Sequence, residues 1–240
     1  MSLDRMSRRS LLKVGAAAGG AVVVGRYYAG PAFAAPPKLA KKDSYTIGFA
    51  QTGNTNTFET KLRWKLITTD AGEHTAKQLA DVDSIIAQQP DIFIFPPRES
   101  KALAPAVLKI KAAGIPVILI DRDVDHSIAK PGEDYVTFIG SDFVQQGMKV
   151  AEWLTKAMKG NAKIIELEGT TGADPAILRK KGFDDYIAGT YKGTPTAAGA
   201  QSGMQIIASQ SGDFVRDTGR KVMETLLQSH PDVTAVYAHN

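Results

Sequence analysis

Short apolar runs alternate with segments of helical periodicity from Tyr45 to the last residue, Asn240. Apolar runs bounded by turn residues indicate β-strands, and apolar residues three or four positions apart indicate helices that bury one face. This alternation is typical of parallel sheets covered by helices on both faces. The sequence therefore predicts an α/β protein built from doubly wound parallel sheets.

The predicted strands form two groups, separated near Gly140. We expect strands at residues 45–51, 65–69, 91–95, 116–120 and 135–139, and then at residues 163–167, 204–208 and 233–238. Each group has its own helices, so we predict two lobes, at residues 45–140 and 141–240, with a ligand cleft between them. A doubly wound lobe ordinarily continues into a helix after a core strand. We therefore expect the second lobe to be incomplete and the chain to be truncated at its C-terminus.

Spacing and capping residues locate the helices between these strands. Leu79, Val82 and Ile86 form an apolar stripe, and we expect all three to face the first sheet. Asp142 and Asp213 each stand where a carboxylate can cap the first turn of the following helix.

The first 34 residues have the three parts of a removable export signal. The pair Arg8-Arg9 lies in a charged start, a mildly apolar stretch follows at residues 14–25, and Ala32-Phe33-Ala34 is a small-x-small cleavage site. We interpret residues 1–34 as a twin-arginine signal peptide and residues 35–44 as a linker. The mature protein is therefore expected in the periplasm.

The signal peptide also accounts for the net charge of the chain. The sequence has 29 basic and 25 acidic residues, of which the first 34 residues hold five and one, respectively. The remaining chain is balanced, with 24 of each, which gives no support for nucleic-acid binding. The absence of cysteine excludes disulfides, thiolate metal sites and a cysteine nucleophile. The histidines have no metal-ligand spacing, so we expect no metal ion and no cofactor.

A predicted buried strand ends directly before Asp121 and Arg122. In open α/β sheets, ligands bind beyond the carboxyl ends of the strands. A carboxylate accepts hydrogen bonds and a guanidinium donates them, so this pair suits a hydroxyl-rich ligand such as a sugar. The alternative is a strand-end ion pair of structural value alone. Asp123 and Asp125 continue an alternation that begins like a calcium loop, but His126 stands where that loop needs glycine.

Seven short motifs follow one another in a collinear order from the first strand to the end of the chain. They are Ile47–Gln51, Gly114–Arg122, Ile139–Asp142, Glu168–Ala173, Arg179–Phe183, Ser209–Phe214 and Tyr237–Asn240. In order and spacing this set resembles the periplasmic sugar-binding proteins of type I, the solute receptors of ABC importers in the ribose- and galactofuranose-binding group. The resemblance implies two doubly wound lobes that hold a sugar between them.

The resemblance also implies which residues would bind the ligand. Asp121 and Arg122 match the Asp-Arg pair of the family at the end of the fourth strand. Arg179 matches its arginine one turn into a helix, and Asn240 matches its asparagine at the end of a second-lobe strand.

The first loop of this family supplies an asparagine and an aromatic residue, for which Asn54 and Phe58 are the candidates. The connection at residues 53–64 is short, so this crossover has room for a very short helix at most. Glu168 is a further candidate for a place in the cleft. Glu166 and Glu168 lie on the same side of a strand, where a glycosidase could use two carboxylates, but we expect this pair to be structural.

The resemblance implies the periplasmic substrate-binding component of an ABC sugar importer, which closes on a monosaccharide by a hinge motion and is not an enzyme. Its partners would be the monosaccharide ligand and the membrane permease, without nucleic acid, and we expect a monomer. Two alternatives stay open. One is a secreted carbohydrate-active enzyme, and the other is a sugar sensor that presents its ligand to a membrane receptor.

Overall fold

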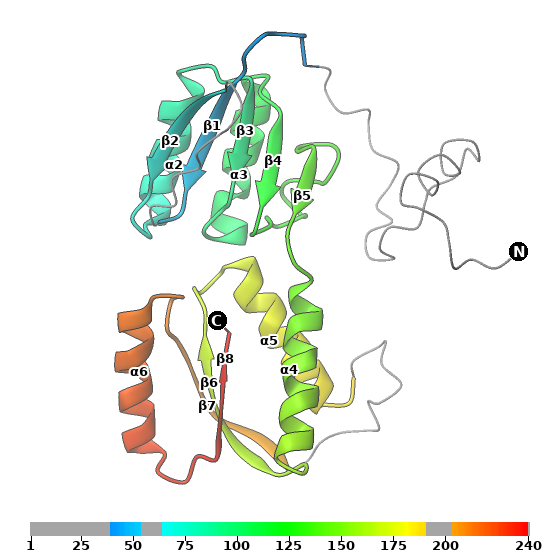
Figure 1. Cartoon of the computed structure of the whole chain (residues 1–240), viewed down its shortest axis with the longest axis vertical. Helices are drawn as coiled ribbons and strands as arrows, with labels where there is room; N and C mark the ends of the chain where they lie inside the picture. The colour runs from blue at the N-terminus through cyan, green and yellow to red at the C-terminus, as the bar shows by residue number, and fades with distance from the viewer. Residues whose placement is uncertain (1–38, 54–63, 191–202, 240) are drawn as a thin grey trace, which may run out of the picture. The chain divides into compact units, whose positions relative to one another are not determined.

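The computed structural model describes residues 39–53, 64–190 and 203–239 (Figure 1). The predicted signal peptide and residues 54–63 of the short first crossover lie outside these ranges. Within them, no helix has both the length and the apolar character that crossing a membrane requires.

Five parallel strands in the order β2-β1-β3-β4-β5 form the first sheet. They are β1 Thr46–Gln51, β2 Lys65–Asp70, β3 Ile92–Phe95, β4 Val117–Ile120 and β5 Thr137–Ile139. The helices α2 Thr75–Ile86 and α3 Ser100–Ala112 pack against each other and against this sheet. The strands lie where the apolar runs predict them, because a strand buried on both faces needs a continuous apolar run.

The first core lies between these strands and helices. Phe93 and Phe95 of β3 are fully buried, and their rings meet edge to face with centroids 6.0 Å apart. Leu103, Val107 and Ile110 of α3 are also fully buried. Their spacing of three or four residues gives α3 one apolar face, which packs on the sheet.

The buried face of α2 is rotated relative to the prediction. Val82 is fully buried, whereas Leu79 is 37% exposed. Gln78 takes the inward position, and its side-chain amide donates to the carbonyl oxygens of Ala50 and Pro96 at 3.1 and 2.8 Å. Because these bonds satisfy backbone groups at the ends of two strands, glutamine is favoured here over leucine. The expectation for Leu79 is therefore wrong.

The second sheet has three parallel strands within the described residues, in the order β7-β6-β8. Its elements are α4 Phe143–Ala157, β6 Ala162–Glu168, α5 Asp174–Ile187, β7 Met204–Ser211, α6 Arg216–Ser229 and β8 Ala235–Ala238. The helices α4 and α5 pack closely together, and α6 lies on the opposite side of this sheet (Figure 1). The α/β class with parallel sheets, predicted from the alternation, is confirmed.

The helices α4 and α5 approach each other at two glycines, Gly147 and Gly182. A β-carbon on Gly182 would lie 2.0 Å from the carbonyl oxygen of Val144, so only glycine fits at this crossing. Beside the crossing, Phe183 of α5 stacks on Tyr237 of β8 with ring centroids 4.0 Å apart. The close contact thus fixes α5 against both α4 and the sheet.

The carboxylate of Asp142 caps α4, as the sequence predicts. It accepts a hydrogen bond from the backbone N–H of Gln145 at 2.9 Å. The predicted lobe boundary at Gly140 falls in the connection between β5 and this cap, and it stays a prediction.

Candidate functional site

Asp121 and Arg122 stand at the carboxyl end of β4. The backbone of Asp121 has a φ of 61°, in the left-handed region that residues with a β-carbon rarely adopt. Its N–H donates to the carbonyl oxygen of Ile139 at 2.9 Å, and its side chain is 67% exposed. Strained backbone of this kind is enriched at functional sites. Here it leaves the carboxylate accessible to a ligand.

Arg122, in contrast, is buried and held by the protein. Its Nη1 donates to the carbonyl oxygen of Arg98 at 3.0 Å, and its Nε lies 3.8 Å from Oδ2 of Asp121. Burial lowers the pKa of Arg122, and the charge of Asp121 acts in the opposite direction. A guanidinium stays protonated in proteins, so this site contains a fixed cation with hydrogen-bond donors.

Arg179 belongs to the same group of side chains. Its Nε donates to Oε1 of Gln146 at 3.0 Å, and its guanidinium carbon lies 4.8 Å from the ring centre of Phe143. The ring of Phe214 is 5.9 Å away. Burial lowers the pKa of Arg179, and the negative charge of Asp121 opposes that effect. The ring of Phe214 is thus the group that Arg179 shares with Arg122.

Phe214 is a candidate site residue that the sequence analysis did not single out. Its ring centre lies 5.5 Å from the guanidinium carbon of Arg122 and 5.9 Å from that of Arg179. These cation–π contacts place one aromatic face between two groups of donors, an arrangement suited to the C–H face of a sugar. The available signal was its place at the end of the motif Ser209–Phe214, which the resemblance already includes.

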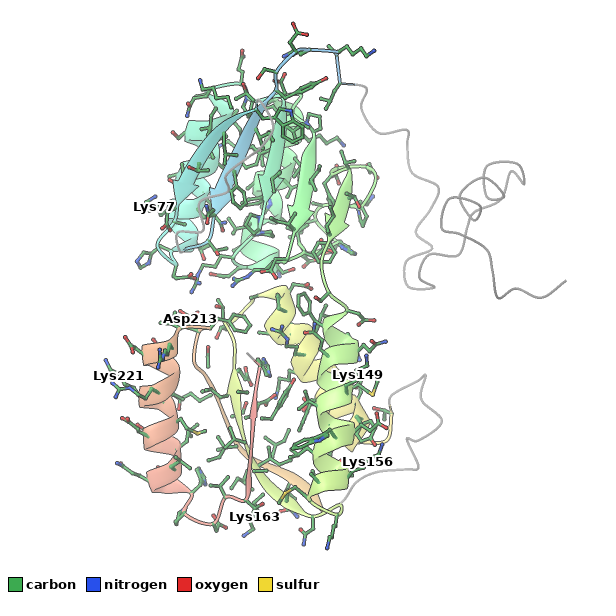
Figure 2. All side chains as sticks on the ribbon, viewed as in Figure 1. Lys77, Lys149, Lys156, Lys163, Asp213 and Lys221 are labelled. Carbon is green, nitrogen blue, oxygen red and sulfur yellow. The ribbon has the colours of Figure 1, made fainter. Side chains whose placement is uncertain are left out.

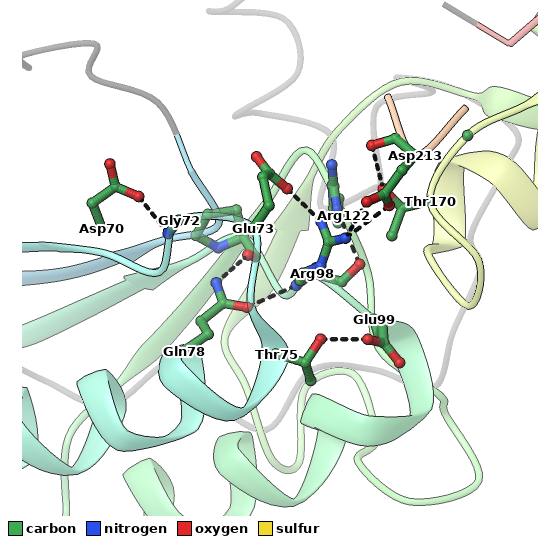
Figure 3. A network of polar contacts seen from close by, with 12 residues as sticks. Asp70, Gly72, Glu73, Thr75, Gln78, Arg98, Glu99, Arg122, Thr170 and Asp213 are labelled. Atoms are coloured by element: carbon green, nitrogen blue, oxygen red, sulfur yellow. Dashed lines mark hydrogen bonds and ion pairs between the residues drawn. The ribbon is translucent and has the colours of Figure 1, made fainter. Parts of the chain in front are cut away.

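A second residue that the sequence analysis missed, Arg98, joins several elements in a polar network (Figure 3). Its Nη2 donates to both carboxylate oxygens of Asp213, at 2.7 and 2.9 Å, and its Nη1 pairs with Glu73. Its backbone N–H donates to Oε1 of Gln78 at 2.9 Å.

The prediction of Asp213 as a helix cap is wrong. Val215 is the N-cap of α6, and the carboxylate of Asp213 pairs with Arg98 instead.

Glu166 and Glu168 lie on the same side of β6, as the sequence predicts. The hydroxyl of Ser209 lies within hydrogen-bond distance of both carboxylates, at 2.7 Å from Glu166 and 2.5 Å from Glu168, and both pair with Lys180. Glu166 is fully buried. Burial alone would raise its pKa, but hydrogen bonds from His239, Lys180 and Ser209 together lower it to about 2. A carboxylate held this firmly in its ionised form is a poor general acid or base near neutral pH, so the pair does not favour glycosidase chemistry.

Glu168 and Phe214 line a cavity of about 400 Å³ in the second group of elements. The remaining lining residues are Leu167, Gly212, Val215, Arg216, Gly219, Arg220 and Met223. Glu168 pairs with Lys180 and Ser209 and not with Arg98, Arg122 or Arg179, and its place in ligand binding stays a prediction.

Three predicted site residues, Asn54, Phe58 and Asn240, lie outside the described residues. Among the residues that the structure does describe, no group of three acidic or histidine side chains is placed to hold a metal ion. Of the predicted set, Asp121 lies next to Arg122, and the guanidinium groups of Arg122 and Arg179 both contact the ring of Phe214.

Comparison with known proteins gives a consistent result. Residues 45–240 match the periplasmic binding protein domain family. The chain is 33% identical over 221 residues to the ribose import binding protein of Bacillus subtilis, covering 88% of this chain and 66% of that protein. It is 33% identical over 222 residues to the galactofuranose-binding protein of Escherichia coli, covering 86% and 65%.

A solved structure also resembles this chain closely. It is the periplasmic binding protein of the arabinose ABC transporter from Shewanella sp. ANA-3, bound to α- and β-L-arabinofuranose. The identity is 32% and the TM-score 0.67, over 81% of this chain and 64% of that one. The chain thus spans just under two thirds of the length of these relatives. Because the family match includes every described strand and helix, the chain belongs to the periplasmic binding protein domain family.

Proposed function

We propose that this chain is the substrate-binding component of an ABC sugar importer and binds a monosaccharide by hinge closure. One observation carries the proposal: the Asp121 carboxylate, the Arg122 and Arg179 guanidinium groups and the Phe214 ring converge at the carboxyl ends of the strands. The names of the relatives, which refer to ribose, galactofuranose and arabinofuranose, support a sugar ligand.

Each of these groups has a separate task in the proposed complex. The carboxylate of Asp121 accepts hydrogen bonds from two neighbouring hydroxyls, and the forks of Arg122 and Arg179 donate to sugar oxygens. The ring of Phe214 packs against the C–H face of the sugar. Both arginines already hold a protein acceptor, so their orientation is largely set before the ligand binds. The residues proposed to complete the site are Asn54, Phe58, Glu168 and Asn240.

We infer that the protein binds its sugar without transforming it. The acidic pair that could suggest catalysis contains Glu166, which is fully buried and engaged by three hydrogen-bond donors. The proposed partner of the closed form is a membrane permease, and the receptor acts as a monomer in the periplasm. Export through the twin-arginine route predicts that replacing Arg8 and Arg9 by lysine abolishes periplasmic accumulation.

Titration calorimetry of the full chain with D-ribose, D-galactose and L-arabinose tests the proposed function. We expect at least one of these sugars to bind. Asp121→Ala should then weaken binding about 10- to 100-fold, since a hydrogen bond to a charged group contributes about 1.5–3 kcal/mol. Unchanged affinity in this variant would refute the proposed site, and failure of all three sugars to bind would refute the ligand class.

Asp125→Ala is the matched control for this experiment. The carboxylate of Asp125 lies in the same segment after β4, but it accepts hydrogen bonds from the backbone and the hydroxyl of Ser127. We expect this variant to bind sugar like the unaltered chain. A loss equal to that of Asp121→Ala would show that the segment tolerates no substitution, and the assignment of Asp121 would fall.

A further inference from the structure

The guanidinium of Arg98 is shared by two carboxylates that follow strands of different sheets. Glu73 comes after β2 of the first sheet and pairs with Nη1, and Asp213 comes after β7 of the second sheet and pairs with Nη2 (Figure 3). The side chain of Arg98, which carries the positive charge, is only 8% exposed to solvent. A buried cation of this kind needs its partners, because an unpaired charge is costly to bury.

Both carboxylates are presented by strained backbone. Glu73 has a φ of 62° and Asp213 a φ of 58°, and Phe214, the next residue, has a φ of 55°. Residues other than glycine adopt this region at a cost, so the surrounding contacts must hold it. The backbone of Asp213 is held from within its own group of elements, because its N–H donates to Ser211 and its carbonyl oxygen accepts from Thr170, both at 3.1 Å.

The backbone of Asp213 stays within its own group of elements, whereas its side chain reaches across to Arg98 of the first group. We propose that Arg98 is a positioning residue that couples closure of the two lobes to the placement of Phe214, through its ion pair with Asp213. This proposal rests on the proposed function in one respect only, namely that closure of the lobes captures a sugar. The coupling itself is a property of the chain without ligand.

The second carboxylate explains why such a contact can be reversible. If the lobes separate, Arg98 loses Asp213 but keeps Glu73, so the buried cation is never left alone. The Asp213 side chain is 37% exposed and returns to water at low cost. The ion pair therefore favours the closed form without locking it, and a receptor that must release its sugar needs this balance.

A distance measurement between two labels tests the coupling without any sugar. The chain has no cysteine, so thiols introduced at the exposed positions Gln88, after α2, and Lys221, on α6 (Figure 2), carry spin labels at defined sites. Pulsed electron paramagnetic resonance then gives the distribution of distances between the lobes. We compare the unaltered chain with Arg98→Met, Asp213→Asn and the double variant.

We expect each single variant to shift the distribution away from the distance of the closed form and to lower the ratio of closed to open molecules about 5- to 30-fold. The double variant should add little to either single change, because both remove the same contact. Arg98→Lys should give an intermediate effect, since an ammonium cannot offer one fork to two carboxylates. Lys149→Met, which removes an exposed cation of α4, is the control and should leave the distribution unchanged.

Identical distributions in the unaltered chain and in Asp213→Asn would overturn the proposal, as would single effects that simply add in the double variant. Asp213→Asn serves this purpose even if Arg98→Met fails to fold, because the altered side chain is partly exposed. If none of the sugars bound, the proposed function would be refuted. The distances between the labels could still be measured, so the coupling would be tested independently.

Discussion

Gly147 of α4 lies directly against the backbone of Arg179 in α5: a β-carbon at position 147 would come within 2.0 Å of the Arg179 carbonyl oxygen. The same arginine carries one of the guanidinium groups of the proposed sugar site. Packing of the two helices and geometry of the site are therefore linked through one residue. The hydroxyl of Tyr237 donates to that carbonyl oxygen at 3.1 Å, which reinforces the link.

Gly147→Ala should lower the free energy of unfolding by about 2–3 kcal/mol, because the neighbouring atoms are backbone and cannot move aside cheaply. It should also weaken sugar binding, since relief of the clash displaces Arg179. Urea unfolding and calorimetry measure the two effects.

Gly219→Ala on α6 is the matched control. Its β-carbon would lie 3.4 Å from Leu167, so the variant should be neutral or stabilised by up to about 1 kcal/mol. Equal losses in both variants would contradict this reasoning.

Glu166→Gln should destabilise the chain by about 1.5–3 kcal/mol at neutral pH, because a neutral amide weakens the buried hydrogen bonds that the carboxylate accepts from Lys180 and His239. The pKa of about 2 in the folded state lies below the ordinary glutamate value of 4.5. The ionised carboxylate therefore contributes stability that is present above pH 4.5 and is lost as the pH falls toward 2. Urea unfolding at pH 7 and pH 3 should show the cost of the substitution shrinking at the lower pH. If the loss of stability were the same at pH 7 and pH 3, the charge of Glu166 would not be its cause.

Asp174→Asn should stabilise the chain above pH 6. One carboxylate oxygen of Asp174 is buried without a hydrogen-bond partner, and burial, together with the charge of Asp123, raises its pKa from 3.8 to about 6. The folded protein thus holds this proton more tightly than the unfolded chain does, and the associated stability is lost as the pH rises through 6. We expect a gain of about 1–2 kcal/mol at pH 7.5 and none at pH 4.

The control for this pH dependence is Asp217→Asn. Asp217 also lies in the first turn of a helix, α6, but it is exposed. Its substitution should cost a few tenths of a kcal/mol, roughly, through the helix dipole. Thermal melts of both variants across pH 4–8 distinguish the outcomes, and a stabilising Asp217→Asn would indicate a general charge effect instead.

Gln78→Leu should cost about 2–4 kcal/mol, because it removes three buried hydrogen bonds, those to the Ala50 and Pro96 carbonyl oxygens and the one from the Arg98 N–H. It should also reduce sugar affinity, since the backbone of Arg98 holds Arg122 in place. Gln88→Leu, at an exposed position, should change neither quantity by more than about 0.5 kcal/mol. A stable Gln78→Leu variant with full affinity would remove Gln78 from the support of the site.

The parts of the fold that depend on local pattern could be predicted from the sequence. Strand β4 and the position of Asp121 follow from one apolar run and its polar end, because burial on both faces permits few other arrangements. Strand β7 is longer than its apolar run predicts. Its polar end, Ser209–Ser211, pairs with β6 opposite Glu166–Glu168, and hydrogen bonds between polar side chains replace apolar packing there.

The contacts that join distant segments could not be predicted in the same way. Arg98 follows two prolines with nothing in its neighbourhood to indicate Asp213, which is 115 residues further along the chain. Asp213 looks like a helix cap because caps are local, whereas its actual partner depends on how the two groups of elements meet. The prediction that Leu79 is buried fails for a similar reason. The inward position on α2 is occupied by Gln78, whose acceptors, the Ala50 and Pro96 carbonyl oxygens, lie on other segments.

The order of the strands has a consequence for the chain as it leaves the ribosome. All five strands of the first sheet lie between Thr46 and Ile139, so that sheet can form while the rest is still being synthesised. In the second sheet, the central strand β6 pairs only with β7 and β8, both of which follow it. One edge of β6 can pair once β7 has been synthesised, but the other edge stays unpaired until Ala238 has emerged. An exposed strand edge can pair with another chain, so this is the interval in which aggregation threatens most.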